Sequence, residues 1–379
     1  MGNFFANTTK RTEPPFRYDI VGSFLRPQAL KEAREKFQIG KITKAELTQV
    51  EDEEIKKLVD KQKKLGLKAV TDGEFRRSYW HLDFFASLNG VEEIEAERWS
   101  VAFKGHQPKA ATLKIVDKVD FVSHPFIDHF QYLKKAAGSH IPKMTIPSPS
   151  MLHLICCVRA EQYTPIEHYV TEEALYFDIA MAYQKAIQAF YDAGCRYLQL
   201  DDTSWGEFCD HEKRAVYAQR GFKLDVIAEK YVAMINLALQ KKPSDMTITM
   251  HICRGNFRST WFSSGGYNPV AETLFGKCNI NGFFLEYDTD RAGNFYPLKE
   301  VSGEKIVVLG LVSSKTGELE NKEQIIDRIQ EAAQYVPMDR LCLSPQCGFA
   351  STEEGNILTE EQQWKKLNFI KGIAEEVWR

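Results

Sequence analysis

The sequence predicts an α/β protein, a (β/α)₈ TIM barrel. Eight short apolar runs recur along the 379-residue chain, and amphipathic stretches of helical length separate most of them. Repeated alternation of strand and helix is typical of a parallel barrel surrounded by a ring of helices. Length alone suggests two domains, but it also suits one barrel that carries insertions. We therefore expect a single barrel domain over residues 1–379.

The eight predicted strands are short runs of mainly apolar residues, and polar residues stand at or just after the ends of most of them. They are Asp19–Phe24, Lys68–Gly73, Lys143–Ser148, Arg196–Asp201, Thr247–Cys253, Gly282–Tyr287, Ile306–Val312 and Leu341–Ser344.

The predicted helices have apolar residues at helical spacing between the strands. The clear ones are Lys44–Leu65, Thr171–Ala193, Leu224–Gln240, Lys322–Tyr335 and Glu360–Val377. Thr43 and Glu46 form a Thr-x-x-Glu pattern in front of the first helix, which predicts a capping box.

One stretch, from about Phe84 to His140, breaks the alternation of strand and helix. Within it, Trp99–Lys104 and Ala111–Val119 alternate between apolar and polar residues as strands do. We expect a β-hairpin inserted after the second strand of the barrel.

Composition excludes several classes of partner. The formal net charge is −3 and the pI is near 6.3, so no basic field is present to attract nucleic acid or an anionic membrane. The longest apolar runs have strand length, which predicts no transmembrane helix, and residues 1–15 lack a signal-peptide core. We expect a cytoplasmic protein. The sequence leaves its oligomeric state open.

Eight cysteines are scattered along the chain, which predicts reduced thiols rather than a disulfide framework. Six of them have no partner at metal-ligand spacing, and we expect them to be packing residues. They are Cys156, Cys157, Cys195, Cys209, Cys278 and Cys342.

Four donor residues at the ends of three predicted strands suggest a metal site. His251 and Cys253 are two residues apart, so their side chains point the same way from one strand. Glu286 ends the next strand, and Cys347 follows the last. Catalytic groups of barrels lie at the carboxyl ends of strands, and a set of N, S and O donors suits zinc. The alternative is that the cysteines are small buried hydrophobes and the histidine is merely hydrogen-bonded.

Together these residues resemble the catalytic domain of cobalamin-independent methionine synthase, from about Tyr18 to Trp378. The motifs that carry the resemblance are Ile20-Val-Gly-Ser-Phe24, Asp72-Gly-Glu74, Leu198-Gln-Leu-Asp201, His251-x-Cys253, Glu286 and Cys347-Gly348. The resemblance implies a (β/α)₈ barrel with Zn²⁺ held by His251, Cys253, Glu286 and Cys347. It also implies that this chain is similar to the short, single-barrel members.

The resemblance further implies a site for the amino-acid end of homocysteine. Ser23 and nearby amides would take the carboxylate, while Glu74 and Asp201 would take the ammonium. Structural alternatives exist for the acidic motifs. Asp72-Gly73 is common in turns, and Asp201-Asp202 also suits a helix N-cap.

The chain departs from the family pattern near the expected methyl donor. Lys315 stands where the family offers a histidine, in Val312-Ser-Ser-Lys315. Trp80 and His81 would line the donor pocket or simply pack as aromatic residues. Several arginines would bind an anionic donor or a carboxylated substrate, or else be solvated charges at the rim: Arg26, Arg76, Arg77, Arg254 and Arg258. The donor therefore stays open between a methyltetrahydrofolate, methylcobalamin and another methylated compound.

We expect a zinc-dependent methyltransferase that acts on the thiol of homocysteine and forms methionine. A second hypothesis keeps the zinc and changes the electrophile, giving alkyl transfer to another thiol as in a coenzyme M transferase-like relative. A third is a zinc-binding protein without turnover.

Overall fold

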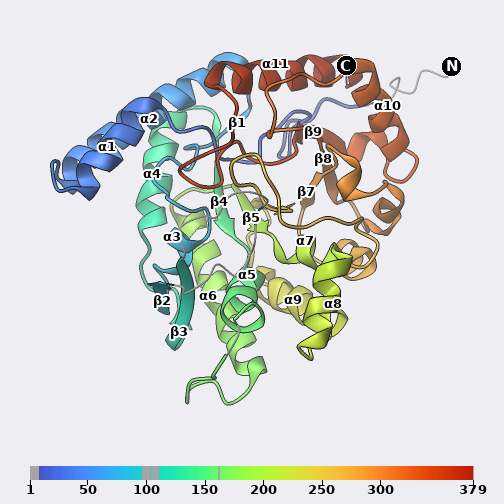
Figure 1. Cartoon of the computed structure of the whole chain (residues 1–379). Helices are drawn as coiled ribbons and strands as arrows, with labels where there is room; N and C mark the ends of the chain where they lie inside the picture. Colours follow the sequence, from blue (N-terminus) through green and yellow to red (C-terminus); the bar gives the residue numbers. More distant parts are fainter. Residues whose placement is uncertain (1–7, 96–102, 104–110, 161–162, 379) are drawn as a thin grey trace.

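A curled sheet of parallel strands forms the centre of the protein (Figure 1). The structure, a computed structural model, describes residues 8–95, 103, 111–160 and 163–378. Within these residues the sheet has seven strands in the order β1-β4-β5-β6-β7-β8-β9, all paired in parallel. They are β1 (Ala69–Val70), β4 (Ile141–Pro147), β5 (Tyr197–Asp202), β6 (Thr247–Ile252), β7 (Gly282–Glu286), β8 (Ile306–Val312) and β9 (Leu341–Pro345).

Helices surround this sheet in Figure 1, and most of them connect one parallel strand to the next. The α-helices are α1 (Gln28–Gln38), α2 (Lys44–Leu65), α3 (Leu82–Phe85), α4 (Pro125–Ala137), α5 (Pro149–His153), α6 (Glu172–Asp192), α7 (Ser204–Cys209), α8 (His211–Gln219), α9 (Leu224–Leu239), α10 (Lys322–Ala332) and α11 (Glu360–Val377). The described residues also include short helices of other types: Leu154–Val158, Glu272–Gly276, Asp290–Ala292, Tyr296–Glu300 and Met338–Arg340. No helix in the described part of the chain is long and apolar enough to cross a membrane.

Successive side chains of a strand point to opposite faces, and in β5 one face is apolar while the other is polar. Leu198 and Leu200 of β5 belong to the large apolar cluster that the helices cover. Gln199 and Asp201, on the opposite face, are buried polar residues that face the inside of the curl. The curl therefore encloses polar side chains close to the carboxyl ends of its strands.

The predicted helices agree closely with the structure. α2 and α11 have the predicted bounds, and Thr43 and Glu46 form the predicted capping box. Six predicted strands, from β4 to β9, differ from the structure by at most two residues at either end. The predicted strand Lys68–Gly73 is shorter, because Thr71 pairs its backbone with the side chain of Gln62 instead of a neighbouring strand.

The prediction of a regular strand at Asp19–Phe24 is wrong. This segment makes one parallel bridge to β9, between Tyr18 and Leu343, and no ladder to β1 among the described residues. Side chains take its carbonyl groups instead: Lys143 donates to Ile20, Gln199 to Val21 and Thr71 to Gly22. We call residues 17–24 the strap, in which side chains hold the central carbonyl groups and backbone hydrogen bonds to Leu343, Phe349 and Gly73 hold the ends.

The insertion after β1 contains an antiparallel pair of strands. They are β2 (Asn89–Glu95) and β3 (Ala111–Asp120), and β3 contains the predicted strand Ala111–Val119. The partner of β3 is Asn89–Glu95, upstream of the predicted segment Trp99–Lys104. That segment, except for Phe103, lies outside the described residues.

Candidate metal and substrate site

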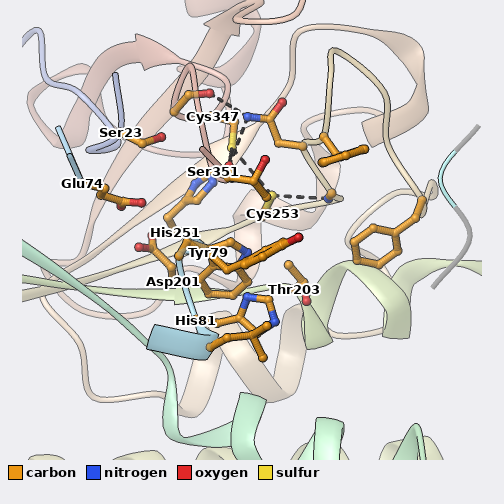
Figure 2. Close-up of a pocket in the computed structure, with 18 of the residues that line it drawn as sticks. Ser23, Glu74, Tyr79, His81, Asp201, Thr203, His251, Cys253, Cys347 and Ser351 are labelled. Carbon is orange, nitrogen blue, oxygen red and sulfur yellow. Dashed lines mark hydrogen bonds between the residues drawn. The ribbon is translucent and has the colours of Figure 1, made fainter. Parts of the chain in front are cut away.

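A cavity of about 900 Å³, including its open mouth, lies at the carboxyl ends of the strands. Figure 2 shows the labelled side chains that project into it from several elements. The predicted site residues in its wall are Ser23, Glu74, Asp201, His251, Cys253 and Cys347. The cavity therefore brings together side chains from the strap, the β1 turn, β5, β6 and the segment after β9.

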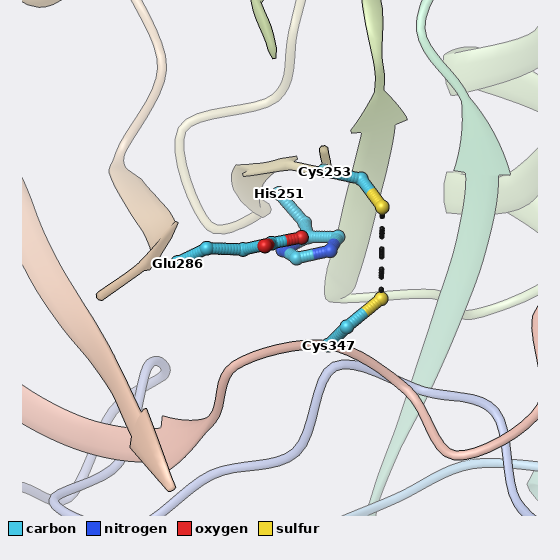
Figure 3. A group of neighbouring side chains, drawn as sticks. All are labelled: His251, Cys253, Glu286 and Cys347. Carbon is cyan, nitrogen blue, oxygen red and sulfur yellow. Dashed lines mark hydrogen bonds between the residues drawn. The ribbon is translucent and has the colours of Figure 1, made fainter. Parts of the chain in front are cut away.

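The four predicted metal ligands converge at one point (Figure 3). One potential ligand atom from each of His251, Cys253, Glu286 and Cys347 lies within 4.8 Å of the others. All four residues are buried, and the two sulfur atoms are 3.7 Å apart as free thiols. Among the described residues, this is the only group of three or more His, Cys, Asp or Glu side chains that could hold a metal ion.

His251 gives direct support for a ligand at this point. Its Nδ1 and Nε2 atoms are both buried, and neither has a hydrogen-bond partner among the described residues. A buried polar atom without a partner is costly, so an imidazole in this state fits a metal ligand. Burial lowers the pKa of His251, but the adjacent Cys347 sulfur outweighs this and raises it above its ordinary value.

The two thiols have different surroundings. The contact with Cys253 lowers the pKa of Cys347 well below the ordinary thiol value, and His251 adds to this effect. The pKa of Cys253 is raised by the same contact and by burial. The backbone N–H of Gly255 also points at the Cys253 sulfur, at 3.3 Å. The pair can therefore carry a negative charge, which a cation would stabilise.

Glu286 is held in a fixed orientation at the end of β7. Its Oε1 accepts from the backbone N–H of Arg254 at 2.9 Å, and its Oε2 pairs with Arg291 at 2.8 Å. Burial raises the pKa of Glu286, but Arg291 and other nearby cations bring it below its ordinary value. The carboxylate is thus ionised and oriented, as a metal ligand must be.

Ser23 lies beside the segment that carries Cys347. The Ser23 carbonyl accepts from Phe349 N at 3.0 Å, and its hydroxyl accepts from Ala350 N at 3.3 Å. Gly348 has to be glycine for this contact, because a Cβ there would lie 1.9 Å from the Ser23 hydroxyl oxygen. The Ser23 hydroxyl lines the cavity and is placed to donate its own hydrogen to a ligand.

Glu74 lies in a turn that presents its carboxylate to the cavity. The turn depends on Asp72, whose Oδ1 accepts from Glu74 N at 2.9 Å, so the turn role of Asp72 is confirmed. Glu74 has a φ of 61°, a left-handed conformation that is rare for a residue with a side chain. Its Oε1 accepts from Thr145 at 2.8 Å, whereas its buried Oε2 has no partner among the described residues. Burial raises the pKa of Glu74.

Asp201 is the second acid in the cavity. Its Oδ1 accepts from Gln199 at 2.7 Å, and its backbone pairs in register with His251. Burial raises the pKa of Asp201 to about 7, and the nearby Glu74 charge contributes to this shift. Glu74 and Asp201 thus lie in the same cavity wall, where the charge of one raises the pKa of the other. The neighbouring Asp202 accepts from Ser204 N in the turn before α7, but the N-cap of α7 is Thr203, so the N-cap alternative is wrong for both aspartates.

Four of the five arginines neither face the cavity, as an anion-binding role requires, nor lie in solvent at its rim. Their side chains are buried and absent from the described cavity wall. Arg26 donates to backbone carbonyls, including Phe24 and Ala350, while Arg77 donates to Thr145. Arg76 pairs with Glu51 and Asp52 on α2. Arg254 packs with its guanidinium carbon 4.3 Å from the Tyr267 ring centre. Arg258 is exposed, as a solvated rim charge would be.

Lys315 does not face the cavity either. Its buried Nζ donates to Gly255 O, Asn256 Oδ1 and Thr260 O at 3.1, 2.8 and 3.2 Å. It thus fastens the loop that follows the two ligands on β6.

Sequence reasoning named Trp80 and His81 but missed other residues of the cavity wall, including Arg159. Trp80 and His81 line the cavity, as residues of a donor pocket would. Burial, together with nearby Arg159, lowers the pKa of His81 to about 3, so its ring is neutral at pH 7. Arg159 donates from Nε to Glu207 at 3.0 Å and from Nη2 to Thr203 at 3.0 Å. It follows a short helix of π type, and no local sequence pattern marks it as part of a site.

The family model for the catalytic domain of cobalamin-independent synthases matches residues 17–363. An uncharacterised protein of Bacillus subtilis, YxjH, is 52% identical over 374 residues, which cover 98% of this chain and 97% of that protein.

Two solved structures are similar to this chain. A putative vitamin-B12 independent methionine synthase from Listeria monocytogenes is 49% identical, with a TM-score of 0.77, and the match covers 96% of this chain and 98% of that one. A B12-independent methionine synthase from a Shewanella species, solved in complex with selenomethionine, has a TM-score of 0.72 at 20% identity. The latter match covers 95% of this chain and 97% of that one, and at this identity it shows a shared fold.

Proposed function

The chain belongs to the cobalamin-independent methionine synthase family, and from this we propose that it transfers a methyl group to the thiol of homocysteine to form methionine. The observation that carries the proposal is the convergence of four potential metal-ligand side chains, three of which line the cavity that also contains Glu74 and Asp201. The new bond joins the homocysteine sulfur to the methyl carbon. The bond from that carbon to the donor breaks, and the donor leaves with its electron pair.

We propose zinc as the metal at His251, Cys253, Glu286 and Cys347. The donor set of one nitrogen, two sulfurs and one oxygen suits zinc better than the hard cations, which prefer oxygen ligands. The chemistry that bound Zn²⁺ supplies is thiol activation, because a coordinated thiol loses its proton and becomes a nucleophile at neutral pH. The partnerless nitrogens of His251 support a metal at this point.

The side chains beside these ligands are suited to bind and orient the amino-acid end of homocysteine. Glu74 offers a buried oxygen without a partner, and Asp201 lies in the same cavity wall. An ammonium between them would be held by two charge-assisted hydrogen bonds. The Ser23 hydroxyl is placed to donate to the carboxylate. Holding both charged ends fixes the direction of the thiol, which lowers the entropic part of the barrier.

The remaining wall of the cavity is available to the methyl donor. Tyr79, Trp80, Phe257 and Phe262 give it an aromatic surface, and His81 contributes a neutral imidazole. We leave the donor open between a methyltetrahydrofolate and another methylated compound, since each presents apolar surface that such a wall can cover.

We also propose that the fold is a closed (β/α)₈ barrel with the strap in the position of the eighth strand. The strap is bridged to β9 through Tyr18 and Leu343, and Phe24 N donates to Gly73 O just after β1. The strap thus touches both edges of the seven-stranded sheet, as a closing segment must.

The test is to incubate zinc-loaded protein with homocysteine and a panel of methyl donors, and to identify products by mass spectrometry. We expect methionine with at least one donor, and loss of methionine in the Cys347→Ser variant. A protein that binds zinc and homocysteine but consumes another electrophile would instead be an alkyltransferase. Stoichiometric zinc without any thiol binding would contradict an enzymatic role.

A further inference from the structure

Gln199 touches both halves of the candidate amino-acid site. It lies at the middle of β5 with its side chain on the inner face, and it is fully buried. Its Nε2 donates to Val21 O in the strap at 2.8 Å and to Asp201 Oδ1 at 2.7 Å. A side-chain amide has only two N–H groups, so both are used here.

The orientation of this amide is determined by its surroundings. Both neighbouring atoms, the Val21 carbonyl and the Asp201 carboxylate, are acceptors. The Gln199 Oε1 atom is buried and has no partner among the described residues. Turning the amide over would place that oxygen against two acceptors and lose both hydrogen bonds. Only one orientation of the amide therefore satisfies the site.

The strap depends on such side-chain donors because it lacks a regular ladder. Lys143 and Thr71 hold the carbonyls on either side of Val21, those of Ile20 and Gly22. Of these three donors, only Gln199 is hydrogen-bonded to a predicted substrate-binding residue. Two residues after Val21, the strap presents Ser23 to the cavity.

We infer that Gln199 is a positioning residue that couples the carboxylate side of the site, through the strap and Ser23, to the ammonium side at Asp201. The inference rests on the proposed function for the identity of the ligand. One planar amide with two fixed N–H directions sets the distance between the strap and Asp201. It thereby selects a ligand whose two charged groups have a matching separation, as the groups of an α-amino acid do.

The experiment compares the zinc-loaded wild type with Gln199→Met, which keeps the volume and removes both donors. Hydrogen exchange of peptides covering residues 17–24 reports on the strap without any ligand. Calorimetry reports the affinities for homocysteine and for 1-propanethiol, which lacks both charged groups. Gln184→Met is the control, since Gln184 makes one comparable hydrogen bond, to Leu237 O at 2.7 Å, between α6 and α9.

We expect at least tenfold faster exchange in residues 17–24 for Gln199→Met and at least tenfold weaker binding of homocysteine. Binding of 1-propanethiol should change by less than twofold, and Gln184→Met should match the wild type in all three readouts. The double variant with Asp201→Ala should lose less than the product of the two single losses, because both changes break the same contact. If Gln199→Met does not fold, Gln199→Glu takes its place. The glutamic acid side chain can donate at most one hydrogen bond, so it cannot hold both Val21 O and Asp201 Oδ1.

Unchanged exchange in residues 17–24 would overturn the inference, whatever happens to homocysteine. Equal losses of affinity for homocysteine and 1-propanethiol would also overturn it, because the change would then be general. Failure of the wild type to prefer homocysteine over 1-propanethiol contradicts the proposed function. In that case the exchange result alone decides whether Gln199 holds the strap.

Discussion

Glu74 combines two unfavourable features in one residue. Its backbone is in the left-handed region at a φ of 61°, and its buried Oε2 lacks a partner among the described residues. Each feature costs on the order of 1–3 kcal/mol in a folded protein. Such costs concentrate where a ligand supplies the missing interaction. In this cavity the ligand that suits a carboxylate oxygen is a cation.

The substitution Glu74→Gln tests this role. It should weaken homocysteine binding by about 1.5–3 kcal/mol, the usual contribution of a hydrogen bond to a charged group. Zinc content should stay at the wild-type value, since Glu74 is not among the four ligands. Calorimetry with homocysteine and with a simple alkyl thiol is the measurement. Equal affinity of the wild type for both thiols would rule out an amino-acid site.

Gly348 must be glycine because of a close contact with Ser23. A Cβ at this position would lie 1.9 Å from Ser23 Oγ, so Gly348→Ala must displace the Ser23 hydroxyl. We expect at least a tenfold loss of homocysteine affinity. The matched control is Gly372→Ala in α11, where a Cβ would meet nothing within 4 Å. That change should preserve binding and raise the free energy of unfolding by up to about 1 kcal/mol. Equal binding by both variants would contradict the contact.

At the scale of elements, the helices and most strands could be predicted because their signals are local. The α2 helix carries its cap at Thr43 and its apolar spacing within 22 residues. The convergence of His251, Cys253, Glu286 and Cys347 could be predicted as well, since each stands at or just after the end of an apolar run. The strap could not, because its carbonyls are taken by Lys143, Gln199 and Thr71, which are remote in sequence. The burial of Arg26 and Arg77 could not be predicted either, because no local pattern reveals the carbonyl groups to which they donate.

The loop after β6 depends on one remote side chain. Lys315 holds the stretch from Gly255 to Thr260 through three hydrogen bonds, and this stretch follows directly after Cys253. Lys315→Met should lower the free energy of unfolding by about 1.5–3 kcal/mol, because it removes a charged donor from buried acceptors. Hydrogen exchange should speed up in residues 254–260 before other regions. Uniformly faster exchange over the whole chain would show that Lys315 has no specific hold on this loop.

At the scale of the whole molecule, buried neutral histidines predict sensitivity to acid. Burial lowers the pKa of His153 from 6.5 to about 3, and its Nδ1 lies 2.9 Å from the Tyr231 hydroxyl. Between these two values the unfolded chain binds one more proton at this site than the folded protein. Stability therefore falls as the pH drops through this range, by at most about 1.4 kcal/mol per pH unit from this residue.

The substitution His153→Gln removes this titration. Unfolding by urea at several values between pH 4.5 and 7 should give a shallower dependence of stability on pH than in the wild type. Parallel curves for the wild type and His153→Gln would contradict a neutral buried His153.

The organisation of residues 1–379 as one domain stays a prediction.

We propose that the sulfur of homocysteine would bind to a zinc ion held by His251, Cys253, Glu286 and Cys347. X-ray absorption at the zinc edge tests it most directly, because it counts the sulfur atoms around the metal. The zinc-loaded protein should show two sulfur neighbours, and the addition of homocysteine should raise the number to three. A count that stays at two in the presence of bound homocysteine, or zinc with no sulfur neighbours at all, would contradict the account.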